Sequence, residues 1–303
     1  MKLGVALRPT VFTPKEIVKI VAALDNRAKV LTTVFIPDVA AGAEPIELSI
    51  ASLAASKRLH VGSGVIRITE HDTEQLARRI LTAQSVSDER FILGVGTGAV
   101  GKDPATKINA MFGKLSELKD KILQRKSATM PKVYIATLRR GIARISAGRC
   151  DGILMNFCSA EHAGRVISSF RSEHKGDAEF ACYIKIFYSH DVEIAQRNMI
   201  QEFANYDSLP QYQKMFIEDC VHEDILHAKE ELAAGRVYVT ESLARISLFN
   251  PSPSSLADLI DHFTKSGITL PVIYPYFDES DDQEYKQKIL LFTLKQLDKP
   301  KIF

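Results

Sequence analysis

Short apolar runs alternate with longer amphipathic stretches along the chain. Eight of these runs are rich in β-branched and aromatic residues and end at Gly, Pro or polar residues, which is typical of β-strands. We therefore expect strands over residues 3–7, 30–38, 59–66, 91–96, 132–137, 151–157, 179–188 and 270–276.

The stretches between the runs have apolar residues at helical spacing. The first helix is expected to begin at Thr13-Pro14, because Thr13 is a good N-cap, Pro14 suits the first helical position and Glu16 completes a capping box. Further helices are expected over about 45–56, 73–86, 106–124, 139–147, 160–172 and 281–298, with a long, mostly helical tract over about 191–266.

Eight strands, each followed by a helix, are the pattern of a (β/α)8 TIM barrel. An open doubly wound sheet shows the same alternation, so periodicity alone does not establish that the sheet closes. The length of 303 residues fits one large barrel or two smaller domains, and no linker, repeat or low-complexity segment divides the chain. The expected fold is a single α/β domain over residues 1–303, a TIM barrel.

Composition and charge exclude several classes of partner. The chain is 46% hydrophobic and 25% charged, with a net charge of +2 and acidic and basic residues interspersed. This balance is too mild for a nucleic-acid surface. No apolar run is long enough to cross a bilayer, and the N-terminus lacks the features of a signal peptide. We expect a cytoplasmic protein that binds neither nucleic acid nor membrane.

The metal-binding residue types are scattered. No two cysteines form a C-x-x-C pair, so we expect free, buried thiols in a reducing compartment rather than zinc or redox chemistry. His222 and His227 are five positions apart, a spacing that does not place both on one helix face. No metal site is predicted. The cysteines are Cys150, Cys158, Cys182 and Cys220.

Glycines alternate at the ends of the third and fourth expected strands, in LHVGSGVI and FILGVGTG. A dinucleotide fingerprint would read G-x-G-x-x-G after the first strand of a βαβ unit, so the spacing and the position both argue against one here. Successive side chains of a strand point to opposite faces, and alternate glycines therefore leave one face bare for a planar ring. The alternative is a tight turn that needs glycine torsions.

Several stretches resemble the luciferase-like flavin oxidoreductases. They are VFIPD, LHVGSGV, QLARRILTAQSVSDERFILGVGTG, MPKVYIATLRRGIARISAGRCDGILMNFCSAEHA and FNPSPSSLADLIDHFTKSGITLPVIYP. The subgroup that this chain resembles most uses the 5-deazaflavin coenzyme F-420 and includes methylenetetrahydromethanopterin reductase. The matching positions include Ser87, Arg90, Phe91, Leu93, Ala147-Gly148, Asp151-Gly152 and Asn156.

The resemblance implies a barrel that binds FMN or coenzyme F-420 at its C-terminal rim, and a homodimer that acts on a small-molecule substrate. The cofactor ring would lie over the third strand against a cis peptide, for which Gly64–Val65 is the matching bond, and Asp38 would lie near the polar edge of the ring. The expected cofactor-binding residues are Asp38, Gly62, Gly64, Val65, Gly94, Gly96, Thr97, Gly98, Thr137, Arg139, Arg140 and Asn156.

Three residues are candidates for catalysis, each with a simpler alternative. Asp38 accepts a hydrogen bond or relays a proton, or else caps the next helix. Arg8, just past the first strand, pairs with an anionic substrate group or a phosphate, or else is a surface charge. His71 is a general acid, or else a loop histidine without a task, in which case Glu70 and Asp72 beside it are candidate proton carriers.

The remaining candidates concern binding. Arg139 and Arg140 open a helix, where backbone N–H groups and guanidinium charge favour a cofactor phosphate, or else they are solvated helix arginines. Asn156 holds the ring carbonyls or the ribityl chain, or else is a turn residue. Phe12, Phe157 and Tyr274 are substrate walls or core packing.

The chain departs from the pattern of the deazaflavin reductases. It has Ala6 where they carry a carboxylate in the first strand, and Val39 where histidine usually follows the aspartate. Residues 99–131 form a short connection where relatives insert an excursion that helps to cover the substrate. The leading hypothesis is an oxidoreductase that moves a hydride between a deazaflavin or FMN and a small organic substrate. The alternatives are a non-catalytic flavin-binding barrel and a phosphate-binding barrel of isomerase or lyase type.

Overall fold

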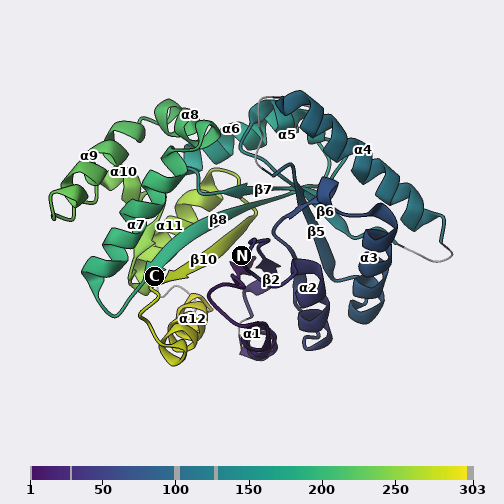
Figure 1. The fold of residues 1–303 in the computed structure, drawn as a ribbon, viewed down its shortest axis with the longest axis horizontal. Helices are drawn as coiled ribbons and strands as arrows, with labels where there is room; N and C mark the ends of the chain where they lie inside the picture. Colours follow the sequence, from purple (N-terminus) through teal and green to yellow (C-terminus); the bar gives the residue numbers. More distant parts are fainter. Residues whose placement is uncertain (1, 28, 99–102, 126–128, 299–303) are drawn as a thin grey trace.

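The strands form one parallel barrel. The computed structural model describes residues 2–27, 29–98, 103–125 and 129–298. In it the strand order is β10-β1-β2-β3-β5-β6-β7-β8, and β10 also pairs with β8, which closes the sheet (Figure 1). The eight strands are β1 (Leu3–Ala6), β2 (Leu31–Ile36), β3 (His60–Ser63), β5 (Phe91–Gly96), β6 (Lys132–Ala136), β7 (Gly152–Asn156), β8 (Glu179–Tyr188) and β10 (Leu270–Phe277). The predicted TIM barrel is confirmed.

Two short strands extend this frame. β4 (Ile66–Arg67) continues the line of β3 and pairs with β5, so the third and fourth predicted strands are neighbours as expected. β9 (Leu248–Phe249) pairs with the end of β8 and interrupts the tract over 191–266 that was expected to be mostly helical.

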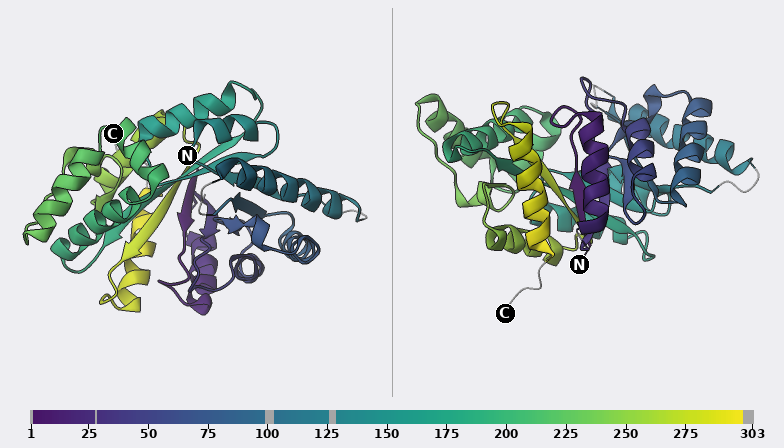
Figure 2. Two further views of the ribbon diagram at one scale, coloured as in Figure 1. Left: turned by 45° about the horizontal axis from the view of Figure 1, so that its top comes forward. Right: turned by 90° about the horizontal axis from the view of Figure 1, so that it is seen from below.

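Helices surround the strands. The outer ring consists of α1 (Pro14–Arg27), α2 (Pro45–Ala54), α3 (Thr73–Ser87), α4 (Pro104–Leu123), α5 (Arg140–Ser146), α6 (Ala160–Arg171), α11 (Pro253–Lys265) and α12 (Gln283–Leu297), with a 3-10 turn, η1 (Ile68–Glu70), before α3. The last helix packs beside the first, which completes the ring (Figure 2). Within the connection over 99–131, residues 99–102 and 126–128 lie outside the described residues.

Four more helices follow β8 and lie together on one side of the barrel (Figure 1). They are α7 (Val192–Asp207), α8 (Pro210–Glu218), α9 (His222–Ala233) and α10 (Glu241–Ala244). None of the helices in the described part of the chain is both long enough and apolar enough to cross a membrane.

The capping box at the first helix is present as predicted. The Thr13 N–H donates to Glu16 Oε2 at 2.8 Å, and the Glu16 N–H donates to Thr13 Oγ1 at 3.4 Å. Two orphan backbone donors at the start of α1 are thereby satisfied, so the chain turns from the end of β1 into α1 at Pro14.

The barrel has a core on each side of its wall. On β8, Ala181 and Tyr183 face the interior, whereas Cys182 and Ile184 face the helices, because side chains alternate along a strand. Small and large residues fill the interior, from Leu270 and Val272 up to Tyr183 and Tyr274. Above these tyrosines, at the carboxyl ends of the strands, space for a ligand remains.

Gly62 lets β3 and β5 approach closely. A Cβ built on Gly62 would lie 2.2 Å from the carbonyl oxygen of Ile92, its partner in the strand register. A real Cβ does not come that close to backbone, so any side chain here would force the two strands apart. Gly113 on α4 is the opposite case, because a Cβ there would have nothing within 4 Å.

We expect Gly62→Ala and Gly113→Ala to change stability in opposite directions. The first overpacks the strand pair and should lower the free energy of unfolding by at least about 1–3 kcal/mol. The second removes backbone freedom from a helix interior and should raise that energy by about 0.5–1 kcal/mol. Urea unfolding of both variants and the wild type measures the difference, and a Gly62→Ala protein as stable as wild type would contradict this account of the strand contact.

Candidate functional site

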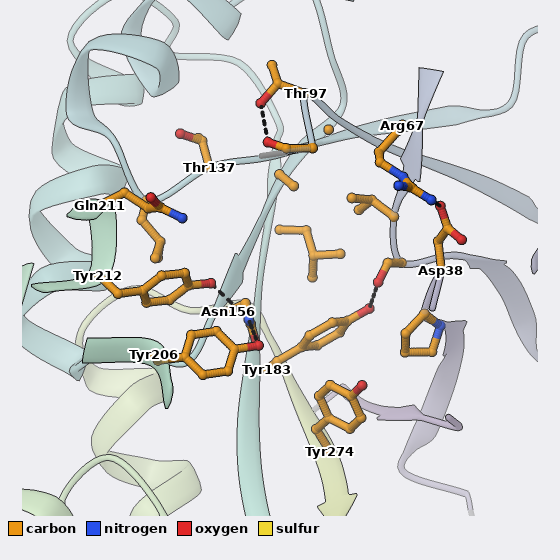
Figure 3. A pocket seen from close by; sticks show the side chains of 18 of the residues that line it. Asp38, Arg67, Thr97, Thr137, Asn156, Tyr183, Tyr206, Gln211, Tyr212 and Tyr274 are labelled. Atoms are coloured by element: carbon orange, nitrogen blue, oxygen red, sulfur yellow. Dashed lines mark hydrogen bonds and ion pairs between the residues drawn. The ribbon is translucent and has the colours of Figure 1, made fainter. Parts of the chain in front are cut away.

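A cavity of about 570 Å³ opens at the carboxyl ends of the strands. This lies within the range of about 300–1,000 Å³ typical of small-molecule pockets. Each of the eight barrel strands contributes a lining residue, from its carboxyl end in most strands and from the middle of the strand for Tyr183 of β8, and α7 and α8 add more. Figure 3 shows the side chains converging on the space from both halves of the barrel.

One wall of the cavity contains three glycines, and the side chains of Tyr183, Val65 and Arg67 lie against them. Its residues come from the ends of β3 and β5, and the Gly64–Val65 peptide bond is cis, as the resemblance implied. The Tyr183 hydroxyl donates to the Gly64 carbonyl at 3.0 Å and fixes that carbonyl from the opposite side of the barrel. The expected residues on this wall are Gly64, Val65, Gly96, Thr97 and Gly98, and all five line the cavity.

Two of the predicted glycines are not on this wall. Gly62 and Gly94 lie deeper, and the carbonyl oxygens of Ile92 and Ser63 stand 2.2 Å from where their Cβ atoms would be. The Val65 side chain also covers Gly94, at 2.9 Å from the same point. Their role is close strand packing, so the prediction that Gly62 and Gly94 contact a cofactor is corrected.

Asp38 lies at the cavity and is held by an arginine. It follows β2, and its carboxylate accepts from Nε and Nη2 of Arg67, each at 3.3 Å (Figure 3). Arg67 also pairs with Glu70 at 3.3 Å. The alternative that Asp38 caps the next helix is wrong, because Glu44 is the N-cap of α2.

Three other candidates lie away from the cavity. His71 follows η1 and is not among the lining residues, and Asp72 beside it is the N-cap of α3. Arg140 is exposed, pairs with Glu218 at 4.0 Å and is not among the lining residues. These residues face outward because each one begins or precedes a helix of the outer ring.

Of the three aromatic residues predicted as substrate walls, one lines the cavity and two belong to the core. Tyr274 lines the cavity. Phe12 is buried against Phe277, with ring centroids 5.9 Å apart. Phe157 packs at 4.5 Å from Phe203, so it is core.

The loop between β6 and α5 carries Thr137 and Arg139 to the cavity, as predicted for both. The Arg139 N–H donates to Thr137 Oγ1 at 3.0 Å, which holds the turn. Within the described residues, no carboxylate pairs with the Arg139 guanidinium. Arg139 is thus a cation at the rim of the cavity without an ion-pair partner among the described residues.

Asn156 is the last residue of β7 rather than a turn residue, and it lines the cavity. Its Nδ2 donates to the hydroxyls of Tyr206 and Tyr212 at 3.1 and 2.9 Å (Figure 3). Its Oδ1 is buried with no hydrogen-bond partner. A buried acceptor of this kind is unusual in a folded protein, so a ligand donor would be favourable here.

A buried ion pair forms the opposite side of the site. The side chain of Lys185, on β8, is fully buried, and its Nζ donates to Oε1 of Glu202 on α7. The Tyr276 hydroxyl donates to the same oxygen at 2.7 Å. Burial alone would raise the pKa of Glu202, but the charge and hydrogen bond of Lys185, the Tyr276 hydroxyl and the charge of Arg8 together hold that pKa below its usual value.

Aromatic rings surround the lysine ammonium. Its Nζ lies 3.7 Å from the ring centroid of Tyr206, 4.4 Å from that of Phe157 and 5.0 Å from that of Tyr276. Such contacts stabilise a desolvated cation. The sequence analysis missed this array, although a lone lysine within the apolar run EFACYIKIFY, two positions from Tyr183, is a signal for an inward-facing charge.

The cysteines and histidines form no metal site: no group of three or more His, Cys, Asp or Glu with ligand geometry occurs among the described residues. All four cysteines are free. Cys158 and Cys182 are buried and Cys150 is partly buried, but Cys220 is exposed in the turn after α8, which corrects the expectation for that residue.

The first 117 residues match the family model described as luciferase-like monooxygenase. Residues 1–117 are thus similar to this family in sequence, and the fold is shared with the solved structures described below. Among curated proteins no match was found. The similarity of residues 118–303 to this family therefore rests on the structure.

The luciferase-like fold is shared with enzymes of two cofactor types. A coenzyme F-420 dependent tetrahydromethanopterin reductase from Methanopyrus kandleri is 16% identical, with a TM-score of 0.69 over 98% of this chain and 97% of that one. An F-420-dependent secondary alcohol dehydrogenase solved with an F-420–acetone adduct is 12% identical, with a TM-score of 0.71 over 98% of each chain. The oxygenating constituent of 3,6-diketocamphane monooxygenase from Pseudomonas putida, solved with FMN, is 13% identical, with a TM-score of 0.64 over 100% and 99%.

A buried histidine anchors the loop that carries Thr137 and Arg139. His162 lies on α6, and its Nε2 is 2.7 Å from the Leu138 carbonyl oxygen, while Arg165 Nη2 is 3.2 Å from its Nδ1. Because a guanidinium only donates, Nδ1 accepts and Nε2 carries the proton, so the ring is neutral. Burial lowers the pKa of His162 from its ordinary 6.5, despite the carbonyl that favours the charged form.

This depressed pKa predicts a loss of stability in mild acid. Above pH 6.5 the His162 ring is neutral in both the folded and the unfolded state. As the pH falls below that value, the ring is protonated in the unfolded chain but stays neutral in the folded one, so the free energy of unfolding decreases. His162→Gln keeps both hydrogen bonds but does not titrate, so the loss of unfolding free energy between about pH 7.5 and pH 5.5 should shrink by roughly 1 kcal/mol. Urea unfolding at the two pH values measures this, and an unchanged slope would contradict the assignment.

Proposed function

We propose that this luciferase-like chain is an oxidoreductase that transfers a hydride between FMN or coenzyme F-420 and a small organic substrate. The observation that carries the proposal is the cavity at the carboxyl ends of the strands, in which the segments after β3 and at the end of β5 face several tyrosines. A flat ring fits between these two sides, and the shared fold with F-420- and FMN-dependent enzymes supports the same class of ligand.

The residues present fit a flavin-type cofactor. The buried, unpaired Oδ1 of Asn156 accepts a hydrogen bond from a ring N–H or a ribityl hydroxyl. The unpaired guanidinium of Arg139 binds a phosphate, for which its planar fork is well matched. The ring would lie against the wall that contains Gly64, Gly96 and Gly98, where it would also meet the Val65 side chain. When bound, either cofactor supplies the hydride donor or acceptor, which no side chain can be.

The chain's own groups orient the ligands and exclude water. Tyr183 holds the Gly64 carbonyl in place, and Arg67 holds the Asp38 carboxylate at the edge of the cavity. Tyr206 and Tyr212, from α7 and α8, line the cavity beside Asn156. Asp38 is the group that we assign to accept a hydrogen bond from the ring or to relay a proton.

A second candidate is a barrel that binds the cofactor without turning over a substrate. Ala6 favours it, because the residue is packed in the barrel interior and the described part of β1 presents no carboxylate there. The isomerase or lyase alternative would need an accessible lysine at a strand end. It is disfavoured because Lys185 is fully buried and paired. Oxidation of the reduced, bound cofactor by added substrate candidates separates turnover from storage.

Titration with FMN and with coenzyme F-420, each oxidised and reduced, tests the proposal. We expect saturable quenching of the fluorescence of one of the two cofactors. Arg139→Gln should weaken that binding at least tenfold, since a charge-assisted hydrogen bond contributes about 1.5–3 kcal/mol. Arg140→Gln, the adjacent exposed arginine, is the matched control and should bind as wild type does. Failure of both cofactors to bind would reject the proposal.

The homodimer implied by the resemblance and the cytoplasmic location stay predictions. The small-molecule substrate is part of the present proposal.

A further inference from the structure

Arg8 has a partly unsatisfied guanidinium in the cavity. It follows β1, is half-buried and lines the cavity, and its Nε is buried with no hydrogen-bond partner. The guanidinium carbon lies 5.5 Å from the centroid of the Tyr276 ring, which holds the group in one orientation. A buried donor without a partner is unfavourable, so a ligand oxygen placed there would be stabilised.

The backbone register determines this position. β1 and β10 pair with Gly4 opposite Val272 and Val5 opposite Ile273, and the same register continued along both strands brings Arg8 level with Tyr276. Arg8 is therefore placed by strand pairing beside the Glu202–Lys185 ion pair, which Tyr276 also contacts.

The charges at this side of the cavity do not balance. Arg67 is paired with Asp38 and Glu70, and Lys185 with Glu202. The charge of Arg8 helps to lower the pKa of Glu202. Across the described residues, however, no carboxylate forms an ion pair with Arg8. The array of Arg8, Lys185 and Glu202 thus has two cations and one anion, and one more negative charge would complete it.

On the basis of the proposed function, we infer that Arg8 binds the carboxylate of the substrate, which makes the substrate class a small organic monocarboxylate. One guanidinium supplies two parallel donors, the number that a carboxylate accepts. A phosphate dianion is disfavoured because Glu202 already places a negative charge in the same array. The proposed phosphate site is distinct from this carboxylate site, because Arg139 follows β6 and Arg8 follows β1. These two strands lie opposite each other in the strand order.

The test compares probes of one shape and different charge. Benzoate, benzamide and phenyl phosphate are titrated into the full chain by calorimetry, with and without the cofactor that binds. The variants are Arg8→Gln and Arg8→Lys. The matched control is Arg149→Gln, because Arg149 also stacks on a ring, that of Phe112 at 5.0 Å, but is exposed and outside the cavity.

We expect the wild type to bind benzoate at least tenfold more tightly than benzamide or phenyl phosphate. Arg8→Gln should abolish this preference, Arg8→Lys should retain part of it, and Arg149→Gln should leave it unchanged. Equal benzoate affinity in wild type and Arg8→Gln overturns the inference, as does tighter binding of phenyl phosphate than of benzoate.

Cofactor titration of Arg8→Gln separates this inference from the proposed function. We expect the cofactor to bind the variant as it binds the wild type. A loss of cofactor binding in Arg8→Gln would place Arg8 in the cofactor site and overturn the inference. If no cofactor binds any variant while Arg8 still selects benzoate, the carboxylate site is supported and the redox function is rejected.

Discussion

The pairing of β10 with both β1 and β8 is the contact on which the site depends. It joins the first strand of the chain to strands that begin more than 170 positions later, and it is what turns the sheet into a barrel. On β8 and β10 it sets Lys185 level with Tyr274, and on β1 it brings Arg8 to Tyr276. The lining residues from β1–β3 and those from β8–β10 face each other only because β10 pairs with both β1 and β8.

The buried Lys185–Glu202 pair contributes more to the placement of charge in the site than to the stability of the fold. Taking an ammonium and a carboxylate out of water costs several kcal/mol per ion, of the order of the attraction that the pair regains. The rings around Lys185 and the Tyr276 hydroxyl on Glu202 reduce that cost without turning the pair into a source of net stability. What the pair provides is a fixed, ionised carboxylate beside Arg8 at the cavity.

The sequence predicted the elements better than their contacts. Seven of the eight expected strands, and the helix start at Thr13-Pro14, were within one or two residues of the observed bounds, because these features depend on local geometry. The third expected strand, 59–66, is divided into β3 and β4. Gly62 and Gly94 were assigned to the ligand because an alternating pattern gives the face of a residue but not its depth. Glu202 was missed because one acidic residue in a helical tract is indistinguishable from a solvated one until the register of α7 on β8 is known.

The departures from the reductase pattern take a different meaning in three dimensions. The resemblance places a carboxylate within the first strand, and this chain has Ala6 there, packed under Tyr183 and Tyr274. Ionisable groups nevertheless surround the cavity above that level: Asp38 from β2, Arg8 from β1 and Glu202 from α7. This chain thus lacks the acid at Ala6 and has a base, Arg8, two residues later at the cavity. The charge beside the end of β1 is therefore positive where the reductase pattern has a negative one. Such a change would alter which substrate is bound without changing the wall formed by β3 and β5, so Ala6 argues for a different substrate at least as strongly as for a lost reaction.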